Sequence, residues 1–312
     1  MNRMKCTRCR AYADFAHESH NAKYCAPCFK HHFLRQTQKA IDEHEMFSPK
    51  DRILVAVSGG KDSLGLWAAL LHLKYEVDGI FIDLGFDEVS ARAQKSCQVF
   101  ADYHGQNLYV FSLVDEVGKT VVELKRGSGK PTCAVCGLIK RYIINGVAKA
   151  GAYDCVTTGH NLDDETAKLL SNVLRWREHH LAHQSPLLAE RDGFVRKAKP
   201  FYRLDQEEIR YWNRLEEISF YAAKCPHSKG ATLDYHNEAL SLLEERMPGI
   251  KRNFLYGFFS GGQKVVQGEE KESLTCHSCG ETSVSNLCVF CRLLAGKGKK
   301  PDFAKWWNKV SL

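Results

Sequence analysis

Short apolar runs alternate with amphipathic stretches through the middle of the chain. The apolar runs have the length of buried strands, and the stretches between them have the spacing of helices. Four strands are predicted in this way, at 53–57, 79–84, 107–113 and 153–158. Three helices are predicted between them, at 64–73, 90–103 and 138–150. Strands that alternate with helices indicate βαβ units, so we expect an α/β fold with a doubly wound parallel sheet.

The regions that flank this alternation have other patterns. Residues 1–30 are rich in Cys and His, and residues 31–47 have helical spacing. From about 203 to 258 the pattern is mostly helical, and 268–293 form a second Cys-rich stretch before a basic, aromatic tail. We therefore expect four parts: an N-terminal Cys-rich unit at 1–30, a helical connector at 31–50, a central α/β domain at 51–265, and a C-terminal Cys-rich unit with the tail at 266–312.

The composition is that of a globular protein. Hydrophobic residues make up 44% of the 312 positions and charged residues 26%, which excludes a disordered chain. No apolar run approaches the roughly 20 residues of a membrane span, and no apolar segment of a signal peptide precedes Cys6. We therefore expect a cytoplasmic protein without membrane contact. The net charge of +7 permits a polyanionic partner but does not by itself predict one.

Thirteen cysteines are many for a chain in a reducing compartment, where they indicate metal binding or catalysis rather than disulfides. Two sets of four have the paired C-x2-C form of zinc sites. They are Cys6, Cys9, Cys25 and Cys28 near the N-terminus, and Cys276, Cys279, Cys288 and Cys291 near the C-terminus. Each set supplies the four thiolates of a structural zinc site, so both ends are expected to be zinc fingers. Cys97 and Cys155 are expected to be small buried hydrophobic residues.

Basic residues accompany both Cys-rich ends. They are Lys5, Arg8, Arg10, Lys30 and Arg35 around the first set, and Arg292, Lys297, Lys299 and Lys300 after the second. Such charges either contact RNA phosphates without reading sequence or simply keep a small module in solution. The sequence does not decide between these two interpretations.

A loop rich in Ser and Gly joins the first predicted strand to the helix that follows. It consists of Ser58, Gly59, Gly60, Lys61, Asp62 and Ser63. Two adjacent glycines let backbone N–H groups turn toward an anion, and the positive end of the helix dipole points to the same place. The loop lacks the G-x-x-x-x-G-K-[ST] pattern of another phosphate loop. Its composition and position nevertheless predict a phosphate site.

This loop resembles the pyrophosphate-binding SGGxDS loop of the ATP pyrophosphatases, or PP-loop enzymes. The resemblance implies that residues 58–63 bind ATP with Mg²⁺, and that the enzyme forms AMP and pyrophosphate while it adenylates an oxygen of its substrate. It also implies an adenine nucleotide α-hydrolase-like fold, with adenine near the ends of the first two strands. Ala56 and Ile82 are therefore expected adenine contacts, although a sheet core also requires apolar residues there. Gly159 is expected to let the backbone approach the nucleotide.

Three further cysteines are Cys133 and Cys136, in a C-x-x-C pair, and Cys225, far along the chain. A structural zinc site has four protein ligands, whereas three thiolates leave one metal position open. Soft thiolates also suit an iron–sulfur cluster. The residues alone leave two other interpretations open. Cys133 and Cys136 could form a redox pair, and Cys225 could be an unrelated buried thiol.

Longer runs resemble the tRNA 2-thiolation enzymes of the PP-loop group, and most closely the branch that thiolates uridine 54 of the T-loop. The resemblance covers nearly the whole chain, including both Cys-rich ends. The resembling runs are 133–142 (CAVCGLIKRY), 158–165 (TGHNLDDE), 172–176 (NVLRW), 197–200 (KAKP) and 225–232 (CPHSKGAT). In that family three cysteines hold a [4Fe-4S] cluster, and the resemblance carries this role to Cys133, Cys136 and Cys225.

Three acidic residues open the helix that is expected after the fourth strand. Asn161 is a suitable N-cap, and Asp163, Asp164 and Glu165 then fall in the first turn, where they complement the helix dipole. The carboxyl ends of strands line the ligand crevice of such sheets, so one of these acids is placed to act. By resemblance it is Asp164, with Lys140 as the cation that neutralises charge on the α-phosphate or an oxyanion.

The resemblance thus implies an ATP-dependent tRNA 2-sulfurtransferase that adenylates O2 of uridine 54 and replaces it with sulfur. It further implies three partners: tRNA, a sulfur-carrier protein with a C-terminal thiocarboxylate (or free sulfide), and a second copy of the chain in a homodimer. Three alternatives remain. They are thiolation of uridine 34, a zinc-dependent RNA-binding module without catalysis, and a redox enzyme that uses Cys133 and Cys136 without ATP.

Overall fold

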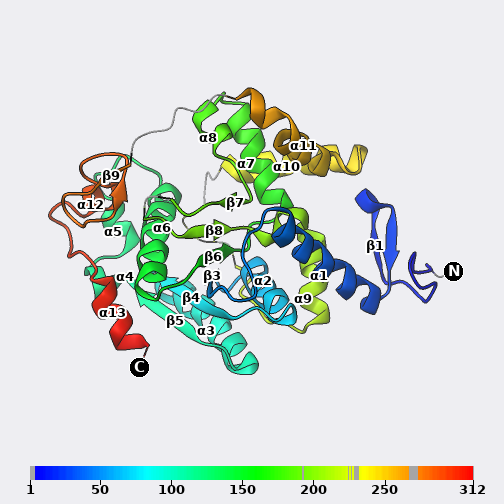
Figure 1. The fold of residues 1–312 in the computed structure, drawn as a ribbon, viewed down its shortest axis with the longest axis horizontal. Coiled ribbons are helices and arrows are strands. Elements are labelled where there is room, and N and C mark those ends of the chain that lie inside the picture. Colours follow the sequence, from blue (N-terminus) through cyan, green and yellow to red (C-terminus); the bar gives the residue numbers. More distant parts are fainter. Residues whose placement is uncertain are drawn as a thin grey trace.

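The computed structural model describes residues 4–191, 193–223, 225, 227, 232–266 and 273–311. A central α/β domain separates two small units, which lie at opposite ends of the long axis (Figure 1). The N-terminal unit contains β1 (Phe15–His17) and β2 (Ala22–Tyr24), which pair antiparallel. The C-terminal unit contains β9 (Leu274–Thr275) and β10 (Thr282–Ser283), which also pair antiparallel.

Six strands form the central sheet, in the order β5–β4–β3–β6–β8–β7. Their bounds are β3 Ile53–Val57, β4 Val77–Asp83, β5 Leu108–Ser112, β6 Cys155–Thr158, β7 Leu187–Leu188 and β8 Arg196–Ala198. Every neighbouring pair is parallel except β7 with β8. The predicted parallel sheet is confirmed, and the four predicted strands are β3 to β6. The strand order reverses between β3 and β6, so a ligand crevice is expected at their carboxyl ends.

Helices pack on the sheet and extend the domain (Figure 1). The helices are α1 Ala26–Glu43, α2 Lys61–His72, α3 Asp87–His104, α4 Leu113–Val117, α5 Val121–Lys125, α6 Thr132–Ala150, α7 Leu162–Val173, α8 Glu178–Ala182, α9 Gln206–Leu215, α10 Thr232–Arg246, α11 Ile250–Ser260, α12 Val289–Leu294 and α13 Phe303–Val310. Short 3-10 helices lie at Glu18–His20, Pro200–Arg203 and Gly262–Val265. Within the described ranges, every helix is too short or too polar to cross a membrane.

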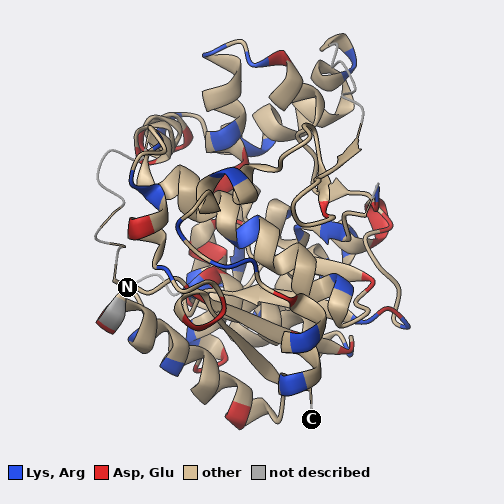
Figure 2. Cartoon of the chain, turned by 90° about the vertical axis from the view of Figure 1, so that its left-hand side faces the viewer, with Lys and Arg blue, Asp and Glu red and all other residues tan. Residues whose placement is uncertain are grey.

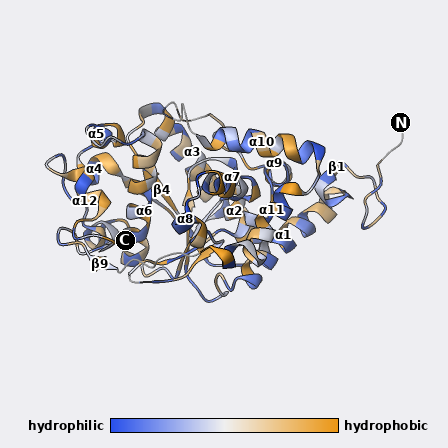
Figure 3. Ribbon diagram, turned by 90° about the horizontal axis from the view of Figure 1, so that it is seen from above, coloured by the Kyte–Doolittle hydropathy of each residue, from blue (hydrophilic) through white to orange (hydrophobic). Residues whose placement is uncertain are grey.

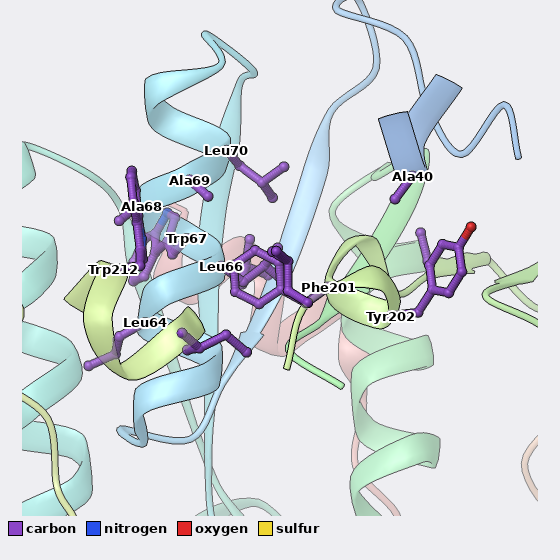
Figure 4. Close-up of a cluster of buried hydrophobic side chains, with 14 of the residues drawn as sticks. Ala40, Leu64, Leu66, Trp67, Ala68, Ala69, Leu70, Phe201, Tyr202 and Trp212 are labelled. Carbon is purple, nitrogen blue, oxygen red and sulfur yellow. The ribbon is translucent and has the colours of Figure 1, made fainter. Parts of the chain in front are cut away.

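Two hydrophobic cores lie on the two faces of the sheet. Successive residues of a strand point to opposite faces, so Val55 belongs to one core and its neighbour Leu54 to the other. Trp67 and Trp212 are fully buried in the first core (Figure 4). There Phe33 of α1 stacks on Trp212, with ring centroids 4.6 Å apart and an interplanar angle of 4°. The helix predicted as a connector therefore contributes to the core.

The second core lies between the sheet, α6 and the C-terminal unit. The ring of Tyr142 on α6 stacks on Phe290 of α12, with centroids 3.9 Å apart. Trp306 of α13 is also buried in this core. Hydrophobic residues consequently run from the sheet strands into the C-terminal helices (Figure 3). The aromatic part of the predicted tail is thus a structural anchor for the second Cys-rich unit.

The structure differs from the sequence prediction at the start of two helices and in two short strands. α2 begins at Lys61 rather than 64, and α6 begins at Thr132 rather than 138. Pro131 precedes α6 with a φ of −59°, a value that suits a helix start. The sequence pattern also misses β7 and β8, because they have only two and three residues and β8 carries two basic side chains. The earlier start of α6 places the C-x-x-C pair in its first turn.

Candidate active site at the carboxyl ends of the strands

The Ser/Gly loop between β3 and α2 is closed by its two serines. Ser63 Oγ accepts a hydrogen bond of 3.0 Å from the backbone N–H of Ser58 and donates one of 3.1 Å to the carbonyl of Gly60. Gly59 has a φ of +75°, and a Cβ atom there would lie 2.4 Å from the carbonyl oxygen of Ala93. Only glycine fits this position. The loop therefore holds the N-terminus of α2 toward the crevice, which is the arrangement of an anion site.

The turn after β6 packs directly against this loop. Asn161 Nδ2 donates a hydrogen bond of 2.9 Å to Asp62 Oδ1, and Lys61 Nζ lies 2.6 Å from the same oxygen. A Cβ atom on Gly159 would lie 2.6 Å from the carbonyl carbon of Asp62. The structure thus gives Gly159 a packing role, since it lets the backbone after β6 approach the backbone of α2.

The three acids at the start of α7 have different surroundings. Asp163 forms a buried ion pair of 2.6 Å with Lys251, and Glu165 forms one of 2.8 Å with Lys199. Asp164 forms no ion pair with any described residue. A lysine therefore pairs with two of the three carboxylates within the fold, and Asp164 has different surroundings.

Asp164 shares a capping box with Asn161. Its backbone N–H donates to Asn161 Oδ1, and its carboxylate accepts from the backbone N–H of Asn161. Desolvation raises the pKa of Asp164 to about 7, and the nearby carboxylate of Asp62 acts in the same direction. A carboxyl group with such a pKa can both take up and release a proton near neutral pH.

A cavity of about 400 Å³ joins the phosphate loop to the three cysteines outside the zinc-like sets. The predicted site residues on its wall are Ser58, Gly60, Ile82, Lys140, Cys133, Cys136 and Cys225. Phe81, Leu84 and Phe86 add an apolar surface to the same wall. Ala56 is outside this lining and packs instead against the second core. Of the two expected adenine contacts, only Ile82 therefore faces the cavity.

Lys140 and Asp164 approach the site from two helices. Lys140 lies on α6 and lines the cavity, two turns after Cys133. Asp164 lies on α7 beside Lys61 and Asp62 and is outside the cavity lining. No ion pair joins Lys140 to Asp164 within the described part of the chain.

The three cavity cysteines come from two segments of the chain. Cys133 and Cys136 are three positions apart at the start of α6, and Cys225 follows α9. Burial raises the pKa of the Cys136 thiol, whereas Lys140 lowers it. Cys133 Sγ lies 3.5 Å from the carbonyl oxygen of His227. The run 225–232 resembles the thiolation enzymes, and its positions 226 and 228–231 lie outside the described residues. The same is true of position 224, which precedes the run.

The two four-cysteine sets have a tighter geometry. In each set the four sulfur atoms lie within 4.8 Å of one another, as ligands of one ion do. Among the described residues, Cys133, Cys136 and Cys225 do not form such a group, so their spacing is wider. Although desolvation opposes it, backbone hydrogen bonds lower the pKa values of Cys6 and Cys276 to about 6. A thiolate is the form of cysteine that binds metal.

The two remaining cysteines are buried, as predicted. Cys97 and Cys155 are fully buried. Desolvation raises the pKa of each thiol to about 12, so neither is a reactive thiolate at neutral pH. Neither cysteine belongs to the cavity lining.

A histidine cluster that the sequence did not indicate attaches the N-terminal unit to α9. His17 Nε2 lies 2.5 Å from Asp205 Oδ2, and His32 Nε2 lies 2.9 Å from Glu208 Oε1. His20 Nε2 lies 3.7 Å from the same Glu208 oxygen. The two carboxylates belong to the capping box of α9, so this cluster has a clear docking role.

The basic tail also has structural contacts. Lys297 Nζ donates to the carbonyl of Arg126, and Lys300 Nζ donates to the carbonyl of Ser278. Lys297 therefore joins the C-terminal unit to the central domain, whereas the Lys300 bond lies within the unit. Across the molecule, basic and acidic residues are interspersed, in keeping with the modest net charge of +7 (Figure 2).

Known proteins resemble this chain along nearly its whole length. Residues 29–227 match the family model of the PP-loop domain. The tRNA-5-methyluridine(54) 2-sulfurtransferase of Thermus thermophilus is 41% identical over 93% of this chain and 91% of its own length. The protein of the same name from Thermotoga maritima is 37% identical over 93% of this chain and 96% of its own length.

A solved structure has the same architecture. The U34-tRNA thiolase NcsA from Methanococcus maripaludis, solved with its [4Fe-4S] cluster, matches with a TM-score of 0.83. The match covers 97% of this chain and 99% of that chain, at 22% sequence identity. At this identity the likeness demonstrates a shared fold.

Proposed function

Because the chain belongs to the PP-loop family, together with the tRNA-5-methyluridine(54) 2-sulfurtransferases that it resembles, we propose that it is an ATP-dependent tRNA 2-sulfurtransferase. It adenylates O2 of a uridine, at position 54 of tRNA, and replaces that oxygen with sulfur. The observation that carries this proposal is the single cavity that the phosphate loop shares with Cys133, Cys136 and Cys225. Nucleotide activation and sulfur delivery require such proximity.

ATP would bind with its phosphates on residues 58–63, and Mg²⁺ would accompany them and neutralise part of their charge. The backbone donors of Gly59 and Gly60, the hydroxyls of Ser58 and Ser63 and the ammonium of Lys61 supply the positive surroundings. Asp62 holds Lys61 and Asn161 in place. Ile82 supplies an apolar contact for adenine inside the cavity. Ala56 packs against the second core near the end of β3. Gly159 lets the turn after β6 approach the backbone of Asp62.

The uridine leaves its stack to reach this site. Asp164 then accepts the proton of N3 while O2 attacks the α-phosphorus of ATP, and pyrophosphate leaves. Lys140 stabilises the charge that develops on the α-phosphate. Sulfur adds at C2, and AMP departs with the former O2. The proton held by Asp164 returns to the product, which its pKa of about 7 allows.

Cys133, Cys136 and Cys225 hold a [4Fe-4S] cluster in this proposal. Three soft thiolates suit such a cluster, their wider spacing suits a group larger than one ion, and the cavity leaves space beside them. When bound, the cluster supplies an iron that can carry the incoming sulfur. The two four-cysteine sets hold zinc as structural ions, because four thiolates within 4.8 Å close a tetrahedral site.

The partners in this proposal are tRNA, a sulfur-carrier protein with a C-terminal thiocarboxylate or free sulfide, and a second copy of the chain. In this proposal residues 1–30 are a zinc finger, 31–50 a connector, 51–265 the catalytic domain, and 266–312 a second zinc finger with the tail.

Thiolation at position 34 is the second candidate, because a U34-tRNA thiolase shares the fold. The intact phosphate loop favours catalysis over a purely RNA-binding module or an ATP-independent redox enzyme.

The test is an anaerobic thiolation assay. The protein is reconstituted with iron and sulfide and given unmodified tRNA, ATP and sulfide. We expect 2-thiouridine at position 54, with AMP and pyrophosphate formed in step. Cys225→Ala should abolish thiolation and lower bound iron, whereas the matched control Cys155→Ala changes a buried thiol outside the cavity and should retain both. Thiolation at position 34, or full activity of Cys225→Ala, would contradict the corresponding part of the proposal.

A further inference from the structure

The turn after α7 contains an exposed tryptophan in an unfavourable backbone conformation. The backbone N–H of Arg177 donates to the carbonyl of Asn172, and that of Trp176 donates to the carbonyl of Val173, each at 3.0 Å. These two bonds form the Schellman motif that ends many helices, and Trp176 occupies the left-handed position, with a φ of +46°. Glycine normally fills this position, because a side chain there costs conformational energy.

The tryptophan side chain is largely exposed to solvent. It is 77% exposed and takes part in no ring contact or hydrogen bond with a described residue. Its neighbour Leu174 is also 64% exposed. A large aromatic residue that strains the backbone without packing against the chain indicates a role outside folding. A partner surface would supply the contact that the chain itself does not.

The charges beside Trp176 identify the chemistry of that partner. Arg175 and Arg177 are both exposed, and neither forms an ion pair within the described part of the chain. Arg175 only donates a hydrogen bond of 3.1 Å to Ser171 Oγ on its own helix. An exposed indole flanked in sequence by two exposed arginines suits stacking on a nucleobase, with the arginines on adjacent phosphates.

We propose that Arg175, Trp176 and Arg177 form a tRNA contact in which the indole stacks on an unpaired base and the arginines bind neighbouring phosphates. This inference rests on the proposed function, since it assigns part of the tRNA surface to this turn. α7 separates Trp176 from Asp164, and its 12 residues span about 18 Å at 1.5 Å per residue. The stacked base is therefore a different nucleotide from the uridine that is modified. The same helix thus connects a docking contact at one end with an acid/base group at the other.

The experiment compares Trp176→Gly and Trp176→Phe with the wild-type chain. Affinity for unmodified tRNA is measured by anisotropy at fixed salt, and thermal stability is measured in parallel. Loss of the stacked ring should weaken tRNA binding by roughly 5- to 150-fold in Trp176→Gly. Trp176→Phe should retain most of the affinity. Trp176→Gly should melt at or above the wild-type temperature, because glycine relieves the left-handed conformation.

Tyr103 provides the matched control. It is 83% exposed on α3, so Tyr103→Ala removes an exposed aromatic side chain at another place on the surface. Tyr103→Ala should bind tRNA like the wild type. Thiolation kinetics should show a raised KM for tRNA and an unchanged kcat in Trp176→Gly, since the ring lies away from the reacting atoms.

Two results would overturn the contact. One is equal tRNA affinity of Trp176→Gly and wild type. The other is a change from dimer to monomer in Trp176→Gly by light scattering, because the exposed ring would then join two copies of the chain. With either result, the proposed function is still supported if the wild-type chain thiolates tRNA. A wild-type chain that neither binds nor thiolates tRNA overturns both proposals.

Discussion

Asn161 Nδ2 donates a hydrogen bond of 2.9 Å to Asp62 Oδ1, which joins the turn before α7 to the phosphate loop. Asn161 is also the N-cap of α7. Asn161→Ala should therefore lose about 1 kcal/mol of stability through the missing cap. It should in addition raise the KM for ATP, because Asp62, which also contacts Lys61 at the phosphate site, is no longer held by Asn161. Urea unfolding and ATP-dependent pyrophosphate release measure the two effects.

Asp302→Ala separates these effects. Asp302 caps α13 in the C-terminal unit by accepting a hydrogen bond from the backbone N–H of Lys305. It should show a similar loss of stability with an unchanged KM for ATP. If Asp302→Ala raised the KM as much as Asn161→Ala does, the loss of a helix cap would explain the result and the link to Asp62 would carry no function.

The acidity of Asp164 predicts how the reaction depends on pH. Desolvation raises its pKa to about 7. If the carboxylate accepts the N3 proton, the single-turnover rate should rise with pH and level off above about pH 7 to 8. Asp164→Asn should be slower by roughly 100-fold or more and should lack this dependence. A wild-type rate that stays constant from pH 5 to pH 8 would exclude Asp164 as the base.

The same pKa has a consequence for stability. A carboxyl group with a raised pKa in the folded state binds its proton more tightly there than in the unfolded chain. Stability contributed by Asp164 is therefore greatest at low pH and decreases as the pH rises from about 4 to about 7. Asp164→Asn cannot ionise, so its stability relative to wild type should increase over this range. Thermal unfolding at several pH values measures the difference.

Several parts of the fold and site follow from sequence because they depend on local patterns. The apolar runs predict β3 to β6, and the two glycines and two serines predict the phosphate loop. Paired cysteines predict both metal-like sets, since the C-x2-C spacing itself brings thiolates together. Asn161 is predicted as a cap from its place before three acids, and the structure confirms it.

Other parts depend on contacts between distant segments, which a sequence pattern does not contain. His17 lies 188 positions before Asp205, yet the two side chains meet in the folded chain. Lys199 and Glu165 likewise come together only because β8 lies beside β6 in the sheet. Ala56 lies outside the cavity lining and packs against the second core, so its contact with adenine stays a prediction.

The buried pair of Lys199 and Glu165 should dominate the stability of the α7 region. The two side chains are 6% and 1% exposed and lie 2.8 Å apart. Lys199→Met leaves the carboxylate buried without its partner, so a loss of about 3–5 kcal/mol is expected in urea unfolding. The double variant Lys199→Met/Glu165→Leu should lose much less, because no charge then remains unpaired.

An exposed ion pair provides the control for this effect. Arg92 and Glu88 lie 3.2 Å apart on α3 and are 68% and 84% exposed. Arg92→Met should change stability by less than about 0.5 kcal/mol, since solvent screens the pair. Equal losses in Lys199→Met and Arg92→Met would contradict the expected role of burial.

The contact of His17 with Asp205 makes the docking of the N-terminal unit depend on pH. Burial alone would lower the pKa of His17, but the hydrogen bond from its ring to Asp205 raises it above the usual value. The stabilisation is therefore fully present below the unfolded pKa of about 6.5 and is lost as the pH rises through the raised folded value.

The advantage of wild type over His17→Gln in thermal unfolding should shrink between pH 6 and pH 9. His31→Gln, which changes an exposed histidine on α1, should show no such trend. A constant difference between wild type and His17→Gln would mean that His17 stabilises the unit through packing rather than through its charge.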